Sequence, residues 1–165
     1  MEKKEQKIYD FFQELKIPYT VYEHEALFTI EAAEELDKKL GLEICKNLFL
    51  SSRHGTEFFL LLMPGHKKFR TGEVSKQLHV PRMTFASAQE MELFLGVTPG
   101  SVTPLGLIND KENKVKLLID RDVLKEEKIA VHPLVNTATV VINTKDLIEK
   151  LLPAFGHDYI AVEMG

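Results

Sequence analysis

The sequence predicts a single α+β domain over residues 1–165, with a mixed, mostly antiparallel and barrel-like β-sheet core flanked by helices. Three observations lead to this prediction. The chain has 165 residues, the size of one ordinary domain. Hydrophobic residues make up 44% and charged residues 28%, which is typical of a globular protein. Strand-like and helix-like segments do not alternate strictly, which argues against a doubly wound parallel sheet.

The first elements follow from periodicity and from helix boundary signals. Apolar residues recur at helical spacing over residues 3–16 and predict a helix, which Ile17-Pro18 ends. Residues 19–22 are rich in aromatic and β-branched side chains and predict a short strand. Thr29 is expected to cap a short helix over residues 30–36.

The middle of the chain predicts a hairpin followed by short elements. Two apolar runs, 44–50 and 57–63, are separated by a polar, glycine-containing loop and predict paired strands. A helix is expected over 70–79, a strand over 83–86 and a capped helix over 87–95.

An irregular segment follows, because three glycines and two prolines lie within residues 96–106. Residues 105–108 and 115–119 flank a polar turn and predict a second hairpin. A helical turn is expected over 121–127.

The last elements are three strands and a helix. The strands are expected over 128–132, 137–142 and 159–162. Thr144 is expected to cap a helix that runs through Leu151.

Charge is unevenly distributed along the chain. The whole protein has a formal net charge of −4, yet residues 46–82 carry seven basic and two acidic residues. A local basic surface can meet phosphates while the whole protein stays acidic. The alternative is that these cations are scattered and solvated.

Common catalytic and metal-binding patterns are missing from the sequence. Six histidines show no HxH or HExxH spacing, and neither a GxSxG nor a Walker A pattern occurs, so we expect no metal and no cofactor. The one cysteine, Cys45, excludes an internal disulfide and fits a reducing compartment. Cys45 is a candidate nucleophile beside Lys46, but neighbours in a strand point to opposite faces, which favours a buried, inert thiol.

Three segments remain as candidates for chemistry. Lys46, with Asn47 beside it, interrupts an apolar strand, so it either serves function or protects a strand edge. The glycine- and proline-rich loop either presents backbone groups to a ligand or only connects two elements. His132 precedes a proline at a strand end and is either functional or bonded to backbone.

These three segments together resemble the YbaK/ProX family of aminoacyl-tRNA deacylases. The resemblance rests on Lys46-Asn47-Leu48-Phe49-Leu50, on the loop Leu95–Asp110, and on His132-Pro133-Leu134-Val135-Asn136-Thr137-Ala138-Thr139. Gly100, Pro104 and Gly106 match the family's Gly-x-x-x-Pro-x-Gly motif. The resemblance covers most of the chain, from about His24 to about Ile142, and is closest to the stand-alone prolyl-tRNA editing proteins that clear alanine.

The resemblance implies a mechanism without metal or protein nucleophile, in which the enzyme orients water or a ribose hydroxyl and stabilises an oxyanion. Lys46 would hold the phosphate or ribose of the terminal nucleotide, and Asn47 would assist through hydrogen bonds. Backbone groups of the Gly100–Gly106 loop, including Ser101 and Pro104, would hold the aminoacyl group. His132 would line the amino-acid pocket.

Specificity is less determined by these motifs. Phe28, Thr29, Ile30 and Val131 are expected as pocket walls, on the resemblance of the surrounding segments. Valine stands before His132 where the alanine-specific branch is expected to have a larger residue, so the amino acid removed stays open. Ala-tRNA(Pro) is the first candidate. Alternatives are a tRNA carrying cysteine, serine or a non-protein amino acid, and a non-catalytic tRNA-binding or regulatory module.

The implied partner is the acceptor end of an aminoacyl-tRNA, and a prolyl-tRNA synthetase is a candidate for delivering it. The charged N-terminal segment is unlike a signal peptide, and no run approaches the roughly 18 apolar residues of a membrane span, so we expect a cytoplasmic protein without a membrane partner. The oligomeric state stays open.

Overall fold

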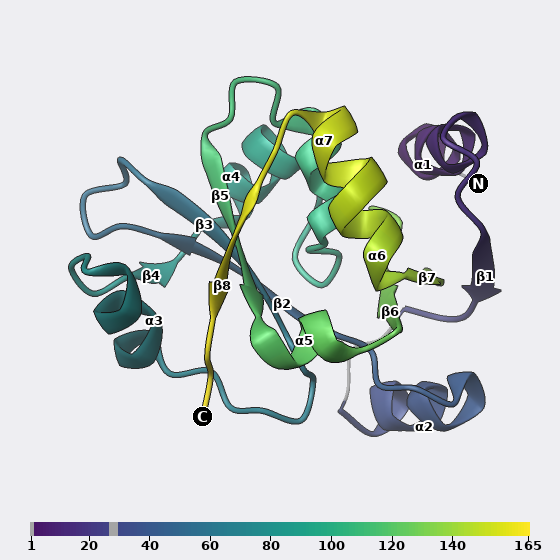
Figure 1. Cartoon of the computed structure of the whole chain (residues 1–165), viewed down its shortest axis with the longest axis horizontal. Coiled ribbons are helices and arrows are strands. Elements are labelled where there is room, and N and C mark those ends of the chain that lie inside the picture. The colour runs from purple at the N-terminus through teal and green to yellow at the C-terminus, as the bar shows by residue number, and fades with distance from the viewer. Residues whose placement is uncertain (1, 27–29) are drawn as a thin grey trace.

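A computed structural model describes residues 2–26 and 30–165, and it consists of two β-sheets packed with helices around a shared core (Figure 1). The helices are α1 Lys3–Glu14, α2 Ile30–Leu40, α3 Thr71–Leu78, α4 Ala88–Leu95, α5 Arg121–Lys125, α6 Thr144–Asp146 and α7 Leu152–Phe155. The strands are β1 Tyr19–Glu23, β2 Lys46–Ser51, β3 Phe58–Met63, β4 Thr84–Phe85, β5 Val115–Asp120, β6 Lys128–Val131, β7 Ala138–Asn143 and β8 Tyr159–Val162.

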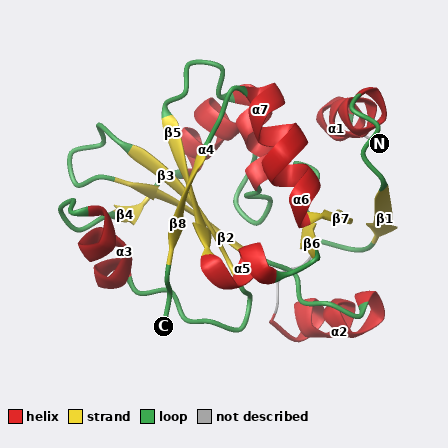
Figure 2. Ribbon diagram, in the orientation of Figure 1, coloured by secondary structure: helices red, strands yellow, loops and turns green. Residues whose placement is uncertain are grey.

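The larger sheet has the strand order β4-β2-β3-β5-β8 and mixes strand directions (Figure 2). β2 and β3 form the predicted antiparallel hairpin, whereas β3 pairs with β5, and β5 with β8, in parallel. All six residues of β3 are buried, as expected for a central strand covered on both faces. The smaller sheet, β1-β7-β6, is antiparallel throughout. The α+β prediction is confirmed, although neither sheet closes into a barrel within the described chain.

The predicted hairpin of residues 105–108 and 115–119 is wrong. Residues Pro104–Asn109 form a 3₁₀ helix, η1, and β5 pairs with β3 instead. Proline fixes a helical φ at the first position, while the Thr103 side chain accepts a hydrogen bond from the Leu105 amide. The Asn109 side chain donates to the Leu95 carbonyl at 2.9 Å and fastens η1 to the end of α4.

Three predicted helix boundaries are tested by the structure. Ser87 caps α4 through a complete capping box with Glu90, as expected. Thr144, in contrast, is not the cap: Asn143 takes that position, and Thr144 is already helical. The helix also continues past Leu151, through a π-helical turn at Leu147–Leu151 and then α7. The predicted cap Thr29 lies outside the described residues.

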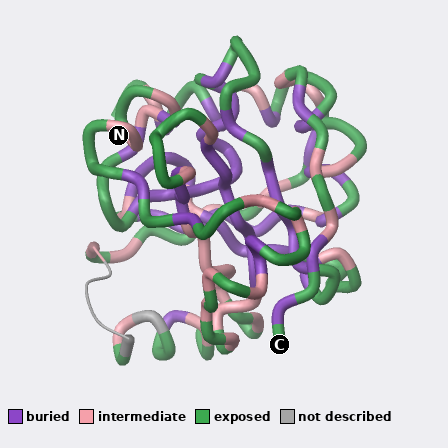
Figure 3. The backbone as a smooth tube through the Cα atoms, turned by 90° about the vertical axis from the view of Figure 1, so that its left-hand side faces the viewer, coloured by how far each residue is buried: buried purple, intermediate pink, exposed green. Residues whose placement is uncertain are grey.

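The larger sheet is covered differently on its two faces. One face packs against α1, α4, η1, the C-terminal helix and the smaller sheet in the main apolar core. The other face packs against α3 and the C-terminal tail in a second apolar cluster. Figure 3 shows buried residues concentrated in the interior of the molecule, with exposed segments around them. Successive residues of β2 therefore point into two different environments.

Candidate active site

A small pocket lies where the start of β2, the glycine- and proline-rich loop and the end of β6 meet. It has a volume of about 150 Å³ and is lined by Cys45, Asn47, Gly100, Val102 and His132. The three segments singled out in the sequence, although far apart in the chain, therefore meet at one pocket. Parallel bridging of Ile44 with Ala130 joins the approach to β2 to β6 and fixes this meeting point.

Strand alternation separates the two neighbouring residues Lys46 and Asn47. Asn47 shares the pocket face of the sheet with Cys45, two residues before it. Lys46 belongs to the opposite face, where its Nζ donates to the backbone carbonyl of Lys67 at 2.5 Å. The structure therefore brings Asn47 and His132 together but places the Lys46 ammonium behind the strand, and its catalytic role stays a prediction.

The protonation state of His132 follows from its hydrogen bond. Nδ1 lies 2.9 Å from the Ala138 carbonyl oxygen, which can only accept, so Nδ1 carries the proton. Burial, opposed by this carbonyl and assisted by neighbouring His24, lowers the pKa of His132. The ring is therefore neutral at pH 7, and Nε2 is left as a hydrogen-bond acceptor.

His24 is a neighbour of the site that the sequence motifs did not single out. Its ring centroid lies 6.3 Å from that of His132. Its Nδ1 lies 2.7 Å from the Glu25 carbonyl, and its Nε2 lies 2.8 Å from the hydroxyl of Thr139. His24 follows Glu23, which pairs with Ala138 in the antiparallel register of β1 with β7. Knowledge of this register would have identified His24 as a neighbour of the site.

Asn47 brings a buried polar atom without a partner. Its Oδ1 is inaccessible to solvent and receives no hydrogen bond from the described residues. Its Nδ2 reaches the Cys45 carbonyl only at 3.4 Å, a weak contact. A buried acceptor left unpaired costs about 1–3 kcal/mol, which makes Asn47 a candidate for binding a hydrogen-bond donor.

The glycine- and proline-rich loop contributes backbone to the pocket. Gly100 has φ +90°, and a Cβ there would lie 3.2 Å from the side-chain nitrogen of Asn136. Glycine therefore allows both the turn and the close approach. Among the described residues, the amides of Gly100 and Val102 donate to no acceptor. They are available to an incoming oxygen.

Other predicted loop residues lie behind the pocket. Ser101, Pro104 and Gly106 are buried and do not line it. A Cβ on Gly106 would lie 3.0 Å from the Cβ of Leu95 and 3.1 Å from its carbonyl oxygen. This glycine therefore serves the close packing of η1 against α4, which holds the loop in place.

The predicted pocket walls are only partly described. Phe28 and Thr29 lie outside the described residues, and Ile30 is described only as the start of α2. Val131 is in β6, fully buried in the main core, and does not line the pocket.

Cys45 lines the pocket but is not activated. Burial is the main cause that raises the pKa of its thiol, to about 12, and the carboxylates of Glu43, Glu126 and Asp37 add to the rise. The thiol therefore stays protonated at neutral pH. Because the thiolate is the reactive form, Cys45 packs as a small apolar residue.

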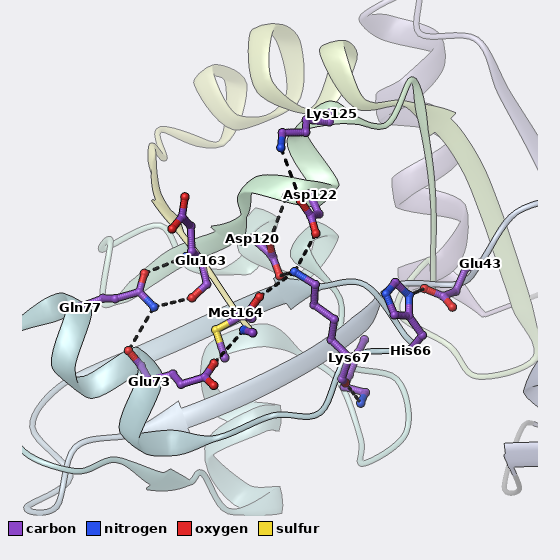
Figure 4. Close-up of polar contacts among 12 residues, drawn as sticks. Glu43, His66, Lys67, Glu73, Gln77, Asp120, Asp122, Lys125, Glu163 and Met164 are labelled. Atoms are coloured by element: carbon purple, nitrogen blue, oxygen red, sulfur yellow. Dashed lines mark hydrogen bonds and ion pairs between the residues drawn. The ribbon is translucent and has the colours of Figure 1, made fainter.

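Behind the strand, a buried ion-pair network fixes the loop that holds Lys46 (Figure 4). Lys67 Nζ contacts carboxylate oxygens of Asp120 at 2.9 Å and Asp122 at 2.8 Å, and the Met164 carbonyl at 2.8 Å. Burial alone would lower the pKa of Lys67, but the two carboxylates outweigh it and raise the pKa. Lys67 is therefore a permanent cation committed to structure.

A larger cavity, of about 550 Å³, lies away from these groups and does not suit the same chemistry. It is lined between α5 and the C-terminal helix, and its charged lining is mainly acidic: Glu126, Glu127, Asp146 and Glu149 against Lys145. Such a lining repels phosphates. We therefore assign the site to the smaller pocket.

Within residues 2–26 and 30–165, no group of three or more His, Cys, Asp or Glu side chains is arranged to hold a metal ion. Across the same residues, no helix combines the length and apolar character needed to cross a membrane.

Comparison with known proteins gives consistent results. The model of the aminoacyl-tRNA editing domain matches residues 24–150. Prolyl-tRNA editing protein ProX of Acetoanaerobium sticklandii is 34% identical over 151 residues, covering 92% of each chain. Prolyl-tRNA synthetase associated domain-containing protein 1 of Danio rerio is 32% identical over 144 residues, 86% of this chain and 78% of its own.

A solved structure supports the fold. The crystal structure of a candidate trans-editing enzyme for prolyl tRNA synthetase superposes with a TM-score of 0.72. The superposition covers 100% of this chain and 99% of that one, at 17% identity. This likeness concerns the arrangement of helices and strands, and the pocket residues are argued from this chain alone.

Proposed function

Because the chain belongs to the aminoacyl-tRNA editing domain family, we propose that it hydrolyses the ester that joins a wrongly attached amino acid to transfer RNA. Similarity to a prolyl-tRNA editing protein over 92% of the chain supports mischarged proline tRNA as the substrate class. The finer proposal is alanine on proline tRNA, cleared by a free-standing cytoplasmic enzyme. A prolyl-tRNA synthetase is the proposed source of this substrate.

The observation that carries the proposal is the set of neutral groups around the pocket. Asn47 Oδ1, once its side chain turns toward the substrate, and His132 Nε2 can accept hydrogen bonds, and the amides of Gly100 and Val102 can donate them. Acceptors suit the amino group of the attached amino acid, water and the ribose hydroxyls. The amides suit the ester carbonyl oxygen, where negative charge develops during attack.

The proposed reaction needs no protein nucleophile. A water oxygen attacks the ester carbonyl carbon, and the bond from that carbon to the ribose oxygen breaks. The proton lost by water ends on the ribose oxygen that leaves. His132 Nε2 accepts a hydrogen bond from the water or from the adjacent ribose hydroxyl and orients it. Holding the reactants in this geometry supplies much of the rate enhancement.

Lys46 is proposed to act from outside the pocket. Its ammonium binds only the Lys67 carbonyl among the described residues, so it can exchange this neutral acceptor for a phosphate oxygen. A phosphate of the terminal nucleotide would then lie at the edge of β2, with the ester reaching past Asn47. Lys46→Ala should remove activity with little loss of stability.

Pocket size supports a small amino acid. About 150 Å³ is below the 300–1,000 Å³ of pockets for drug-sized ligands, which favours a small side chain beside the ester. Apolar contacts distinguish alanine from proline by only about 1–3 kcal/mol unless a steric clash adds to them. Cysteine and serine are therefore the competing substrates.

The test is hydrolysis of Ala-tRNA(Pro) and Pro-tRNA(Pro) by the purified protein, with Lys46→Ala as the inactive control. Rapid release of alanine, slow release of proline and an inactive, folded variant would support the proposal. Release of cysteine or serine but not alanine would keep the deacylase function and change the amino acid assigned as its substrate. Hydrolysis of no charged tRNA would overturn it in favour of a binding module.

A further inference from the structure

An exposed aromatic pair lies on the face of β2 that carries Lys46. Phe85, in β4, is 61% exposed, unusually high for a large apolar side chain. Its ring centroid lies 5.6 Å from that of Phe69, at an angle of 59° between the planes. Phe69 is itself packed against the second apolar cluster and gives the pair a rigid base. A fixed and accessible aromatic ring is a platform on which a nucleic-acid base can stack.

Cations without ion-pair partners lie close to Phe69 and Phe85 in the sequence. Lys68, Arg70, Lys76 and Arg82 are exposed, and none forms an ion pair among the described residues. The carboxylate of this segment, Glu73, already accepts the Gly165 amide at 3.0 Å. Lys67, in contrast, is neutralised by Asp120 and Asp122. Residues 68–85 thus carry four basic side chains against one acidic side chain, a balance that suits the phosphates of single-stranded nucleic acid.

Strand register connects the platform to the pocket. Phe85 pairs with Leu50, and Lys46 lies four residues earlier in the same strand, roughly 13 Å away at about 3.3 Å per residue. That length matches roughly four stacked nucleotides at about 3.4 Å each, or fewer in an extended strand. The loop that holds Lys46 through Lys67 continues directly to Phe69.

The edge of β2 leaves room for such a path. β4 pairs only with Leu50 and Ser51, so within the described chain residues 46–48 have no strand beside them on that side. A chain that runs from Phe85 to Lys46 can therefore pass around this edge to the Asn47 face. The pocket with His132 lies there.

We propose that Phe69 and Phe85, with Lys68, Arg70 and Arg82, form the binding surface for the single-stranded 3′ end of the substrate tRNA, ahead of its terminal nucleotide. The surface rests on the proposed function, since it takes the same substrate. One base stacks on Phe85, and the phosphates on either side meet the cations. The surface binds single-stranded RNA without preference for base sequence, because every base has a face that can stack.

The first experiment measures binding without chemistry. A labelled short RNA that ends in unpaired CCA is titrated with the protein and followed by fluorescence anisotropy. Phe85→Ala should weaken binding roughly 5- to 150-fold, the range for loss of one base–aromatic stack. Phe85→Tyr should bind like the original protein. Leu93→Ala is the matched control, since Leu93 is 74% exposed but lies in α4. It should leave binding unchanged.

A charge variant keeps the test valid if Phe85→Ala is poorly folded. Arg70 is exposed and makes no side-chain cap at the start of α3, so Arg70→Gln should fold normally. It should weaken binding and lower the salt dependence by about one phosphate contact. Equal affinity of the original protein, Phe85→Ala and Arg70→Gln for the RNA would overturn the proposal.

A second readout separates this surface from the proposed activity. Hydrolysis of aminoacyl-tRNA is compared with hydrolysis of the same amino acid on adenosine alone. Phe85→Ala should raise KM for the tRNA and leave the rate on aminoacyl-adenosine unchanged. RNA binding that depends on Phe85, in a protein that hydrolyses neither ester, would support the surface and overturn the proposed function. If Phe85→Ala hydrolyses both substrates like the original protein, the proposed function would be supported and the binding surface overturned.

Discussion

The two faces of β2 differ in charge at the start of the strand. On the pocket face, Asn47 meets His132 and a glycine backbone, and these groups are neutral at pH 7. On the other face, Lys46 lies beside a loop held by the buried cation of Lys67 and two carboxylates. One strand thus separates a site of neutral donors and acceptors from a site of charge.

This difference teaches how a small protein can bind a highly charged substrate and still react with a neutral ester. Phosphate recognition needs cations in contact with water. Stabilising an oxyanion needs fixed dipoles in a place from which water is largely excluded. With the proposed phosphate contact of Lys46 and the proposed oxyanion site on opposite faces of one strand, the two would lie close together without sharing a solvent environment.

The largest expected effect comes from breaking the charged face. Asp120 is 1% exposed, pairs with Lys67 and accepts the Asp122 amide at 2.9 Å as the cap of α5. Asp120→Ala leaves a buried ammonium with one carboxylate fewer and should lower the free energy of unfolding by about 3–5 kcal/mol. Urea denaturation measures the loss.

Asp122→Ala is the matched control for Asp120→Ala. Its carboxylate also contacts Lys67, at 2.8 Å, but the side chain is 50% exposed and partly screened by water. It should therefore cost clearly less stability. Equal losses for the two variants would show that burial does not set the strength of this network.

On the neutral face, Asn47→Ala should change activity and not stability. The buried Oδ1 has no partner among the described residues, so its removal deletes an unsatisfied acceptor. If it positions the substrate, the kcat/KM for ester hydrolysis should fall by roughly 10²–10³-fold, as for loss of one polar group that stabilises a transition state. Steady-state deacylation and thermal melting measure the two quantities.

The opposite pattern for Asn47→Ala, a clear loss of stability with activity kept, would make Asn47 a structural residue. Asn113→Ala is a suitable comparison, since Asn113 is exposed and donates to the Gly156 carbonyl away from the pocket. That variant should leave deacylation unchanged.

A smaller effect is expected where the loop is held behind the pocket. Gly106→Ala would place a methyl group 3.0 Å from the Leu95 Cβ and 3.1 Å from its carbonyl, and should cost about 1–3 kcal/mol by overpacking. Gly72→Ala is the control: nothing lies within 4 Å of its Cβ in helix α3, so it should stabilise by roughly 0.5–1 kcal/mol. Thermal or urea unfolding compares them. A neutral Gly106→Ala would show that η1 can shift.

The same contrast explains what the sequence could and could not predict. Asn47, Gly100 and His132, which line one pocket, were singled out from local patterns: an amide in an apolar strand, a glycine- and proline-rich loop, and a histidine before proline. Most strands were found because their apolar runs are long. Local patterns carry no information on pairing between distant segments, so the 3₁₀ helix η1 was mistaken for one strand of a hairpin with β5.

Pairing also hid two features of the site. His24 becomes a neighbour of His132 only through the register of β1 with β7. Lys46 and Asn47 were grouped because they are adjacent in sequence, yet adjacency in a strand means opposite faces. The role of Lys46 depends on whether the substrate passes the edge of β2, which side-chain types alone do not reveal.

The smallest expected effect is a pH dependence that separates the two faces by titration. Burial lowers the pKa of His132, so the unfolded chain takes up a proton at higher pH than the folded protein. The stability contributed by the neutral ring is present above the unfolded value of about 6.5 and is lost as pH falls through the lowered folded pKa.

Activity that needs the free Nε2 of His132 should follow the folded pKa. The acid limb of kcat/KM should therefore have its midpoint below pH 6.5, whereas Lys67, with a raised pKa, stays charged throughout this range. A pH–rate profile on Ala-tRNA(Pro) measures the midpoint, and one at or above the ordinary histidine value would mean that the group controlling hydrolysis is not the buried, neutral His132.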